Sequence, residues 1–158
     1  MSYERPGKSD EWYTPKYIFD AMKMTFDLDV APAPCNDHVP SRRNVSSDGL
    51  NEPWGGFVWM NPPFGPRNGL TPWLERFFLH GNGVALTPDR TSAPWWQRSA
   101  ERADVILFIS PKVQFINGNG EKGKSPANGT TLFAVGEKGI AALNNARDLG
   151  VLLWRRQR

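Results

Sequence analysis

Hydrophobic residues recur at helical spacing in three parts of the chain. The residues that follow Thr14-Pro15 place their apolar side chains on one face, and Thr and Pro suit the cap and the first position of a helix. The same spacing predicts helices over residues 72–80 and 94–102. A glycine-containing stretch, residues 117–129, shows no such spacing and is predicted to be a mobile loop.

Short apolar runs between these segments predict strands, because each is bounded by Gly, Pro or Asp. The predicted strands cover residues 26–31, 56–60, 83–86, 104–109, 130–135 and 151–154. Residues 36–53 are polar and show only the Asp48-Gly49 turn signal. Strands that alternate with helices favour a three-layer α/β domain with a mainly parallel sheet.

Length and composition indicate one folded domain. The chain has 158 residues, of which 39% are hydrophobic and 22% charged, and this composition is typical of globular proteins. We expect a flexible segment over residues 1–11 and a single domain over residues 12–158. The single cysteine, Cys35, excludes an internal disulfide, and no apolar run reaches the roughly 18 residues of a membrane span, so a cytoplasmic protein is expected.

The charge balance is compatible with a nucleic-acid partner. The net charge is +3 and the pI is near 9.2, values that an ordinary, slightly basic protein also shows. His38 and His80 lack metal-ligand spacing with Cys35 or with each other, so no metal site is expected.

Two predicted strands end in chemically distinctive residues. One is followed by Asn61-Pro62-Pro63-Phe64, the other ends in Asp29-Val30-Ala31. Ligands of open α/β sheets bind at the carboxyl ends of strands. Two consecutive prolines cannot continue a ladder, so Asn61, the Pro62 carbonyl and Phe64 are presented together by a stiff loop.

This trio suits the methylation of an aromatic amine. The lone pair of such an amine is delocalised into the ring, which makes it a poor nucleophile. Two acceptors, the Asn61 side-chain oxygen and the Pro62 carbonyl, would bond its hydrogens and orient its nitrogen for in-line attack. Phe64 would stack on a base extruded from the duplex.

The loop and its surroundings resemble a known family. Asn61-Pro62-Pro63-Phe64 is similar to the catalytic motif of amino-methyltransferases, and the wider frame resembles the phage-type DNA N-6-adenine methyltransferases, the phage Dam family. The matching segments, in order, are Glu11-Trp12-Tyr13-Thr14-Pro15, Phe26-Asp27-Leu28-Asp29-Val30-Ala31, Ser47-Asp48-Gly49-Leu50, the catalytic loop, and Leu86-Thr87-Pro88-Asp89-Arg90-Thr91.

The resemblance implies a Rossmann-like fold that binds S-adenosylmethionine and methylates the N6 amine of adenine in DNA. It further implies a phage or prophage origin in a bacterial host, with the protein acting as a monomer or homodimer. Thr14-Pro15, Asp29, Ala31 and Asp48 would contact the cofactor. The glycine-rich loop common in methyltransferases is absent after Ala31.

The residues also suggest DNA contacts. Arg90 and Lys112 follow strand ends and are candidates for phosphate contacts, as is Lys124 in the basic loop. Trp95 and Trp96 cannot share one helix face, so one of them, assigned as Trp95, is expected to line a cleft.

Other functions remain open at this point. The acceptor of the methyl group could be cytosine N4 or an RNA base, or the chain could be a non-catalytic DNA-binding module. Residues 118–125 match the phosphate-binding pattern G-x-x-x-x-G-K-[ST], but Pro126 and a predicted strand follow where that motif requires a helix. We therefore reject a nucleotide hydrolase.

Overall fold

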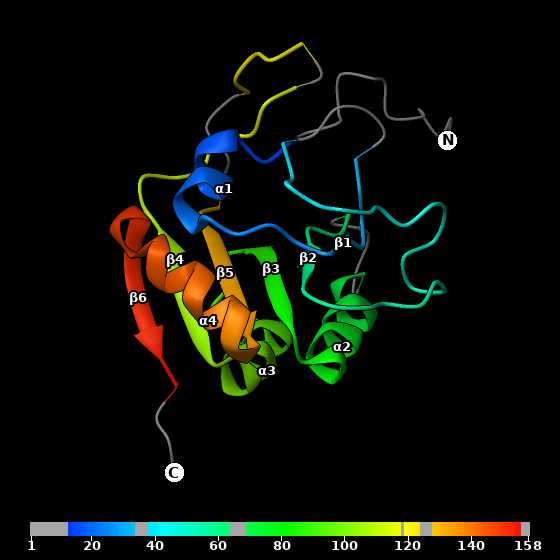
Figure 1. Ribbon diagram of the computed structural model, residues 1–158. Coiled ribbons are helices and arrows are strands. Elements are labelled where there is room, and N and C mark those ends of the chain that lie inside the picture. The colour runs from blue at the N-terminus through cyan, green and yellow to red at the C-terminus, as the bar shows by residue number, and fades with distance from the viewer. Residues whose placement is uncertain (1–12, 34–37, 64–68, 118, 124–127, 156–158) are drawn as a thin grey trace, which may run out of the picture.

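The computed structural model describes residues 13–33, 38–63, 69–117, 119–123 and 128–155. Their helices and strands alternate along much of the chain (Figure 1), which confirms the α/β class. In order the elements are α1 (Lys16–Met22), β1 (Leu28–Asp29), β2 (Val58–Met60), α2 (Leu70–His80), β3 (Gly83–Pro88), α3 (Pro94–Arg102), β4 (Val105–Ile109), β5 (Thr130–Val135), α4 (Gly136–Asn145), the 3-10 helix η2 (Arg147–Leu149) and β6 (Gly150–Trp154). The flexible segment predicted over residues 1–11 lies outside the described residues.

The expectation of a mainly parallel sheet is wrong. The six described strands form a mixed sheet in the order β1-β2-β3-β5-β4-β6. The pairs β1–β2 and β2–β3 are parallel, whereas β3–β5, β5–β4 and β4–β6 are antiparallel. A parallel neighbour requires a crossover, usually a helix. The described residues between β4 and β5 contain no helix, and β5 lies between β3 and β4 in the sheet and runs in the opposite direction to both.

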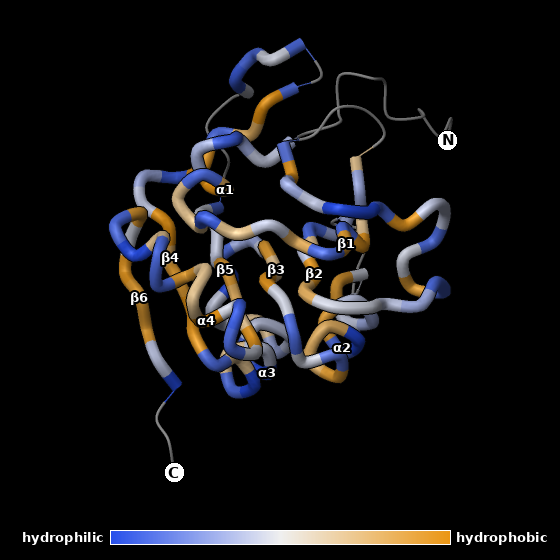
Figure 2. The backbone as a smooth tube through the Cα atoms, viewed as in Figure 1, coloured by the Kyte–Doolittle hydropathy of each residue, from blue (hydrophilic) through white to orange (hydrophobic). Residues whose placement is uncertain are grey.

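Helices cover both faces of the sheet. Alternate side chains of β4 point to opposite faces, as the period of a strand requires. Val105 and Leu107 pack in the core that includes α1 and α4, whereas Ile106 and Phe108 pack against the core of α3. The residues of α2 pack on the same side as α3, and the two helices contact each other. Figure 2 shows hydrophobic residues along β4 and β6, the two strands at one end of the sheet.

Several predicted boundaries differ from the structure by one or two residues, and one strand and one helix differ more. The strand predicted over residues 26–31 is reduced to Leu28–Asp29, because Phe26 forms an isolated bridge with Ser41 instead of pairing with β2. Helix α4 was not predicted at all. None of the helices in the described part of the chain is long and apolar enough to cross a lipid bilayer.

Candidate active site

The carboxyl ends of β1, β2 and β3 lie next to one another. The three strands are parallel, with Asp29 beside Trp59 and Met60 beside Ala85. Asp29 is the last residue of β1, and Asn61 directly follows β2. The sheet therefore brings the two strand ends that the sequence singled out to one edge, where α/β sheets bind ligands.

Thr14 contacts the side chain of Asn61. The sequence suggested Thr14 as a helix cap, but α1 has no side-chain cap, and Pro15 occupies the N-cap position. Instead the Asn61 Nδ2 donates a hydrogen bond to Thr14 Oγ1 over 3.2 Å. Thr14 is buried and Asn61 half-buried. The amide nitrogen is thereby engaged by the protein.

The two acceptors of the loop receive no hydrogen bond from the part of the chain that the structure describes. No described residue donates a hydrogen bond to Asn61 Oδ1 or to the carbonyl oxygen of Pro62. Pro62 is buried, which holds its backbone in place, and Pro63 is exposed. Phe64, the proposed stacking residue, lies outside the described residues. The arrangement can accept two hydrogen bonds from one incoming amine.

Asp29 is a buried carboxylate at the adjacent strand end. Its side chain is 1% exposed, and its Oδ1 accepts a hydrogen bond from the backbone N–H of Ala31 over 3.1 Å. A buried charge is costly unless it is hydrogen-bonded, and this local contact supplies one partner. Ala31 is half-buried beside it. A carboxylate in this position suits a cationic amine or a ribose hydroxyl.

Asp48 lies beside the same strand end, in an exposed turn. Its Oδ1 accepts from the N–H of Leu50 over 3.0 Å, so the carboxylate also closes its own turn. The next residue, Gly49, packs against the end of β1: a Cβ added there would lie 1.9 Å from the Val30 carbonyl oxygen. Only glycine permits this approach, and it places Asp48 close to the residue that follows Asp29.

An anchor on α2 holds the turn against the sheet. Arg76 donates to the carbonyl of Gly49 over 2.8 Å and also to the carbonyls of Leu50 and Glu52, while its guanidinium lies 4.5 Å from the ring centre of Trp54. The Trp54 indole donates to the Gly49 carbonyl over 2.7 Å. Sequence reasoning missed Arg76, because an arginine at a polar position of a helix gives no indication of a partner elsewhere in the chain.

The carboxylate of Glu52 organises the start of this turn. It accepts hydrogen bonds from the hydroxyl of Ser46 over 2.7 Å and from the backbone N–H of Ser47 over 2.8 Å. The Ser46 hydroxyl, followed by the backbone N–H groups of Ser46 and Ser47, lowers the pKa of Glu52 from 4.5 to about 2. The ionised form is the one that these donors stabilise.

The end of β3 carries a carboxylate that sequence reasoning assigned no role. Asp89 accepts a hydrogen bond from the hydroxyl of Thr131, which in turn accepts from the Trp96 indole over 3.2 Å. Gly129 approaches the carboxylate so closely that a Cβ there would lie 2.4 Å from Asp89 Oδ2. The signal was available, because Asp89 follows its strand as Asn61 follows β2.

The residues predicted to contact DNA are spread around this edge. Arg90 and Lys112 are exposed after β3 and β4. Trp95 is half-buried and lines a groove between α2 and α3, whereas Trp96 is buried in the core. Lys124 lies outside the described residues. The structure thus separates the two tryptophans, one at a surface groove and one inside.

The segment that resembles a phosphate-binding loop forms a turn in its described part. The backbone N–H groups of Asn119 and Glu121 donate to the side-chain oxygen of Asn117, and Ile116 bridges to Lys122. Residues 118 and 124–127 are outside the described part, and β5 begins at Thr130. Among the described residues no group of three or more His, Cys, Asp or Glu side chains is placed to hold a metal ion.

Comparison with known proteins gives one match. A family model described as DNA N-6-adenine-methyltransferase (Dam) matches residues 2–143, which include every site residue described above. No curated protein and no solved structure matches the chain. Because the match spans well over half of the 158 residues, the chain belongs to the DNA N-6-adenine-methyltransferase (Dam) family.

Proposed function

We propose that the protein transfers a methyl group from S-adenosylmethionine to the N6 amine of an adenine in DNA, and that the loop after β2 performs the transfer. The observation that carries this proposal is the state of Asn61. Its amide nitrogen donates to Thr14, and its oxygen has no donor among the described residues. That oxygen and the Pro62 carbonyl are therefore available to one amine that has two hydrogens.

The two acceptors act on the amine in two ways. Hydrogen bonds to both N–H groups draw electron density onto the nitrogen, and they fix the direction of its lone pair. The same bonds become stronger as positive charge develops on the nitrogen, so they favour the transition state over the bound substrate. The flipped adenine would stack on Phe64, which the motif places directly after Pro63.

The adjacent strand end would hold the cofactor. When bound, S-adenosylmethionine supplies a methyl group activated by a sulfonium. Asp29, buried at the end of β1, and Asp48, in the turn whose Gly49 packs against Val30, would offer carboxylate oxygens to an amino group and to ribose hydroxyls. Thr14-Pro15 and Ala31 would line the same edge. The parallel half of the sheet, β1 to β3, is the part that we interpret as Rossmann-like.

Transfer of labelled methyl groups, followed by digestion of the acceptor to nucleosides, tests the proposal. Incubation of the protein with labelled S-adenosylmethionine and unmethylated duplex DNA should give labelled N6-methyldeoxyadenosine. Label in N4-methyldeoxycytidine, or only in nucleosides from RNA, would identify a different acceptor. Cofactor and DNA binding without any methylated product would indicate a non-catalytic DNA-binding module.

A further inference from the structure

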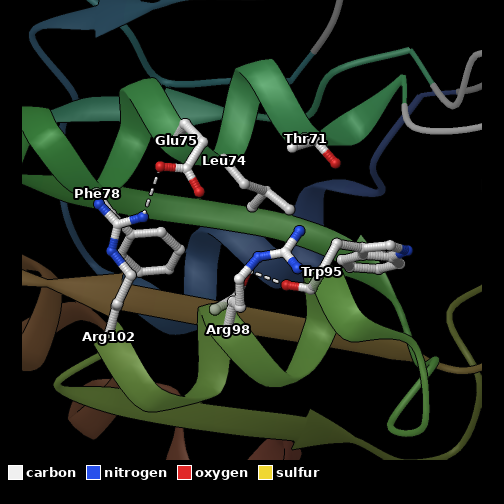
Figure 3. A pocket seen from close by; sticks show the side chains of 8 residues that line it. Thr71, Leu74, Glu75, Phe78, Trp95, Arg98 and Arg102 are labelled. Carbon is white, nitrogen blue, oxygen red and sulfur yellow. Dashed lines mark hydrogen bonds and ion pairs between the residues drawn. The ribbon is translucent and has the colours of Figure 1, made fainter.

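A groove between α2 and α3 runs toward the candidate active site. It is lined by side chains of both helices, among them Thr71 and Leu74 from α2 and Trp95 and Arg98 from α3. Figure 3 shows Trp95 and Thr71 at one end of the groove, with Arg98 near its middle. Helix α2 follows the Asn61 loop and α3 follows β3, so both helices begin at the carboxyl edge of the parallel strands. The Trp95 end is therefore the end closest to the active site.

Positive side chains outnumber negative ones among the residues that line the groove. The guanidinium of Arg102 forms an ion pair with Glu75, with 3.0 Å between Nη1 and Oε2, and lies 5.0 Å from the ring centre of Phe78. Arg98 is exposed, and no described residue forms a hydrogen bond or ion pair with its guanidinium. Among the described side chains that line the groove, Arg98 therefore contributes a positive charge that no carboxylate offsets.

Trp95 adds a half-buried aromatic surface at the active-site end. Its carbonyl accepts a hydrogen bond from the Ser99 hydroxyl over 2.7 Å. The neighbouring Trp96 is 7% exposed and hydrogen-bonded to Thr131, so the start of α3 is anchored to β5. A guanidinium followed by a flat apolar ring fits a phosphate group and the sugar or base next to it.

We propose that this groove binds the DNA backbone beside the adenine to be methylated, with Arg98 contacting one phosphate and Trp95 packing against the adjoining nucleoside. The inference rests on the proposed function, since it assumes that DNA enters at this edge. DNA is the occupant that fits best because a guanidinium with no partner among the described residues complements a phosphate, and neutralising a phosphate releases condensed counterions.

The salt dependence of DNA binding tests the contact. The variant Arg98→Gln should weaken binding of a duplex oligonucleotide, and the slope of log K against log salt should decrease in magnitude by about 0.9, the value for one lost phosphate contact. Lys138→Gln is the matched control. It removes the same charge from an exposed position on α4, which begins at the opposite edge of the sheet, and should leave affinity and slope unchanged.

A second variant separates the two parts of the groove. Trp95→Leu should weaken DNA binding several-fold without changing the salt slope, because the ring carries no charge. Both variants should bind S-adenosylmethionine as the unaltered protein does, which shows that the fold is intact. Unchanged DNA affinity and an unchanged salt slope in Arg98→Gln would overturn the inference. A variant with normal DNA binding and an altered oligomeric state would also overturn it. If the unaltered protein binds no DNA, the proposed function itself fails.

Discussion

The Asn61 side chain can present either its oxygen or its nitrogen to a ligand, since rotation by 180° exchanges the two. Methylation of an amine needs the oxygen. The hydrogen bond from Asn61 Nδ2 to Thr14 Oγ1 holds the nitrogen on the protein side and leaves the oxygen for the substrate. Thr14 is 4% exposed, so water does not compete readily for its hydroxyl. Thr14 is in this account a positioning residue for Asn61.

Replacement of the Thr14 hydroxyl should slow methyl transfer. Thr14→Val keeps the shape of the side chain and removes the acceptor, so kcat should decrease by on the order of 10- to 100-fold through misorientation of Asn61. Thr14→Ser should restore most of the rate. Steady-state kinetics and cofactor titration check both variants. Asp29→Ala provides the contrast, because it should weaken cofactor binding first. A Thr14→Val protein with normal kcat and weakened cofactor binding would assign Thr14 to the cofactor alone.

At the residue scale, the sequence identifies Asn61 and Asp29 but not what holds them. Asn61 follows a hydrophobic strand and Asp29 ends one, and the chemistry of both side chains can be inferred from the sequence. The use of Thr14 was not predictable, since a hydroxyl before proline is equally typical of a helix cap. The contact joins positions 47 residues apart, and a single sequence carries no signal for such a pair.

The turn over residues 46–54 shows how a polar segment without regular structure is kept in one place. Arg76 on α2 binds its carbonyls from one side, and Glu52 binds its first N–H groups from within. Gly49 allows the turn to lie directly on the end of β1. These contacts satisfy the backbone polar groups that a loop otherwise leaves to water. They also explain how the turn that carries Asp48 comes to lie against the end of β1.

Acid should loosen this turn at an unusually low pH. The pKa of Glu52 is lowered to about 2 by the donors of Ser46 and Ser47. Since the folded-state pKa lies below the ordinary value of 4.5, the interaction is fully present above that pH and is lost as the pH falls toward 2. The amide NMR signals of Ser46 and Ser47 should therefore titrate with a midpoint near 2.

The variant Glu52→Gln is the control for this titration. It removes the ionisable group, so the two serine amide signals should show no midpoint in the same range. The measurement is restricted to pH values at which the remaining amide signals keep their folded positions. A midpoint at the ordinary pKa of a glutamate would show that the hydrogen bonds do not persist in solution.

Among the elements, α4 shows the limit of prediction from hydrophobic spacing. Its sequence begins with glycine, contains Gly139, and ends in two asparagines, all poor helix formers. The structure shows why glycine is present: a Cβ at Gly139 would lie 2.7 Å from the Gly83 carbonyl oxygen. Close packing of the helix on β3 thus requires a residue that lowers intrinsic helix propensity, and tertiary contact outweighs it.

At the scale of the whole molecule, the sheet has a parallel half and an antiparallel half. The parallel strands β1 to β3 bring Asp29, Asn61 and Asp89 to neighbouring positions at one edge. The antiparallel strands β4 to β6 continue the sheet beyond β3 and enlarge its hydrophobic core. Helix α4 packs across β3, β4 and β5. Most elements were predictable from their hydrophobic patterns, but strand order and direction were not. A strand that is buried on both faces shows the same hydrophobic run whether its neighbour is parallel or antiparallel.

The central claim is that the loop after β2 is the catalytic part of this molecule, and Asn61→Ala tests it most directly. The measurement compares the rate of N6-methyldeoxyadenosine formation with the affinity for S-adenosylmethionine in the same preparation. Asn144→Ala, an exposed substitution of the same kind at the end of α4, is the control. We expect Asn61→Ala to lose about 10²- to 10³-fold in rate or more while binding the cofactor normally, and Asn144→Ala to keep its rate. An Asn61→Ala protein that methylates adenine at the rate of the control would contradict the account.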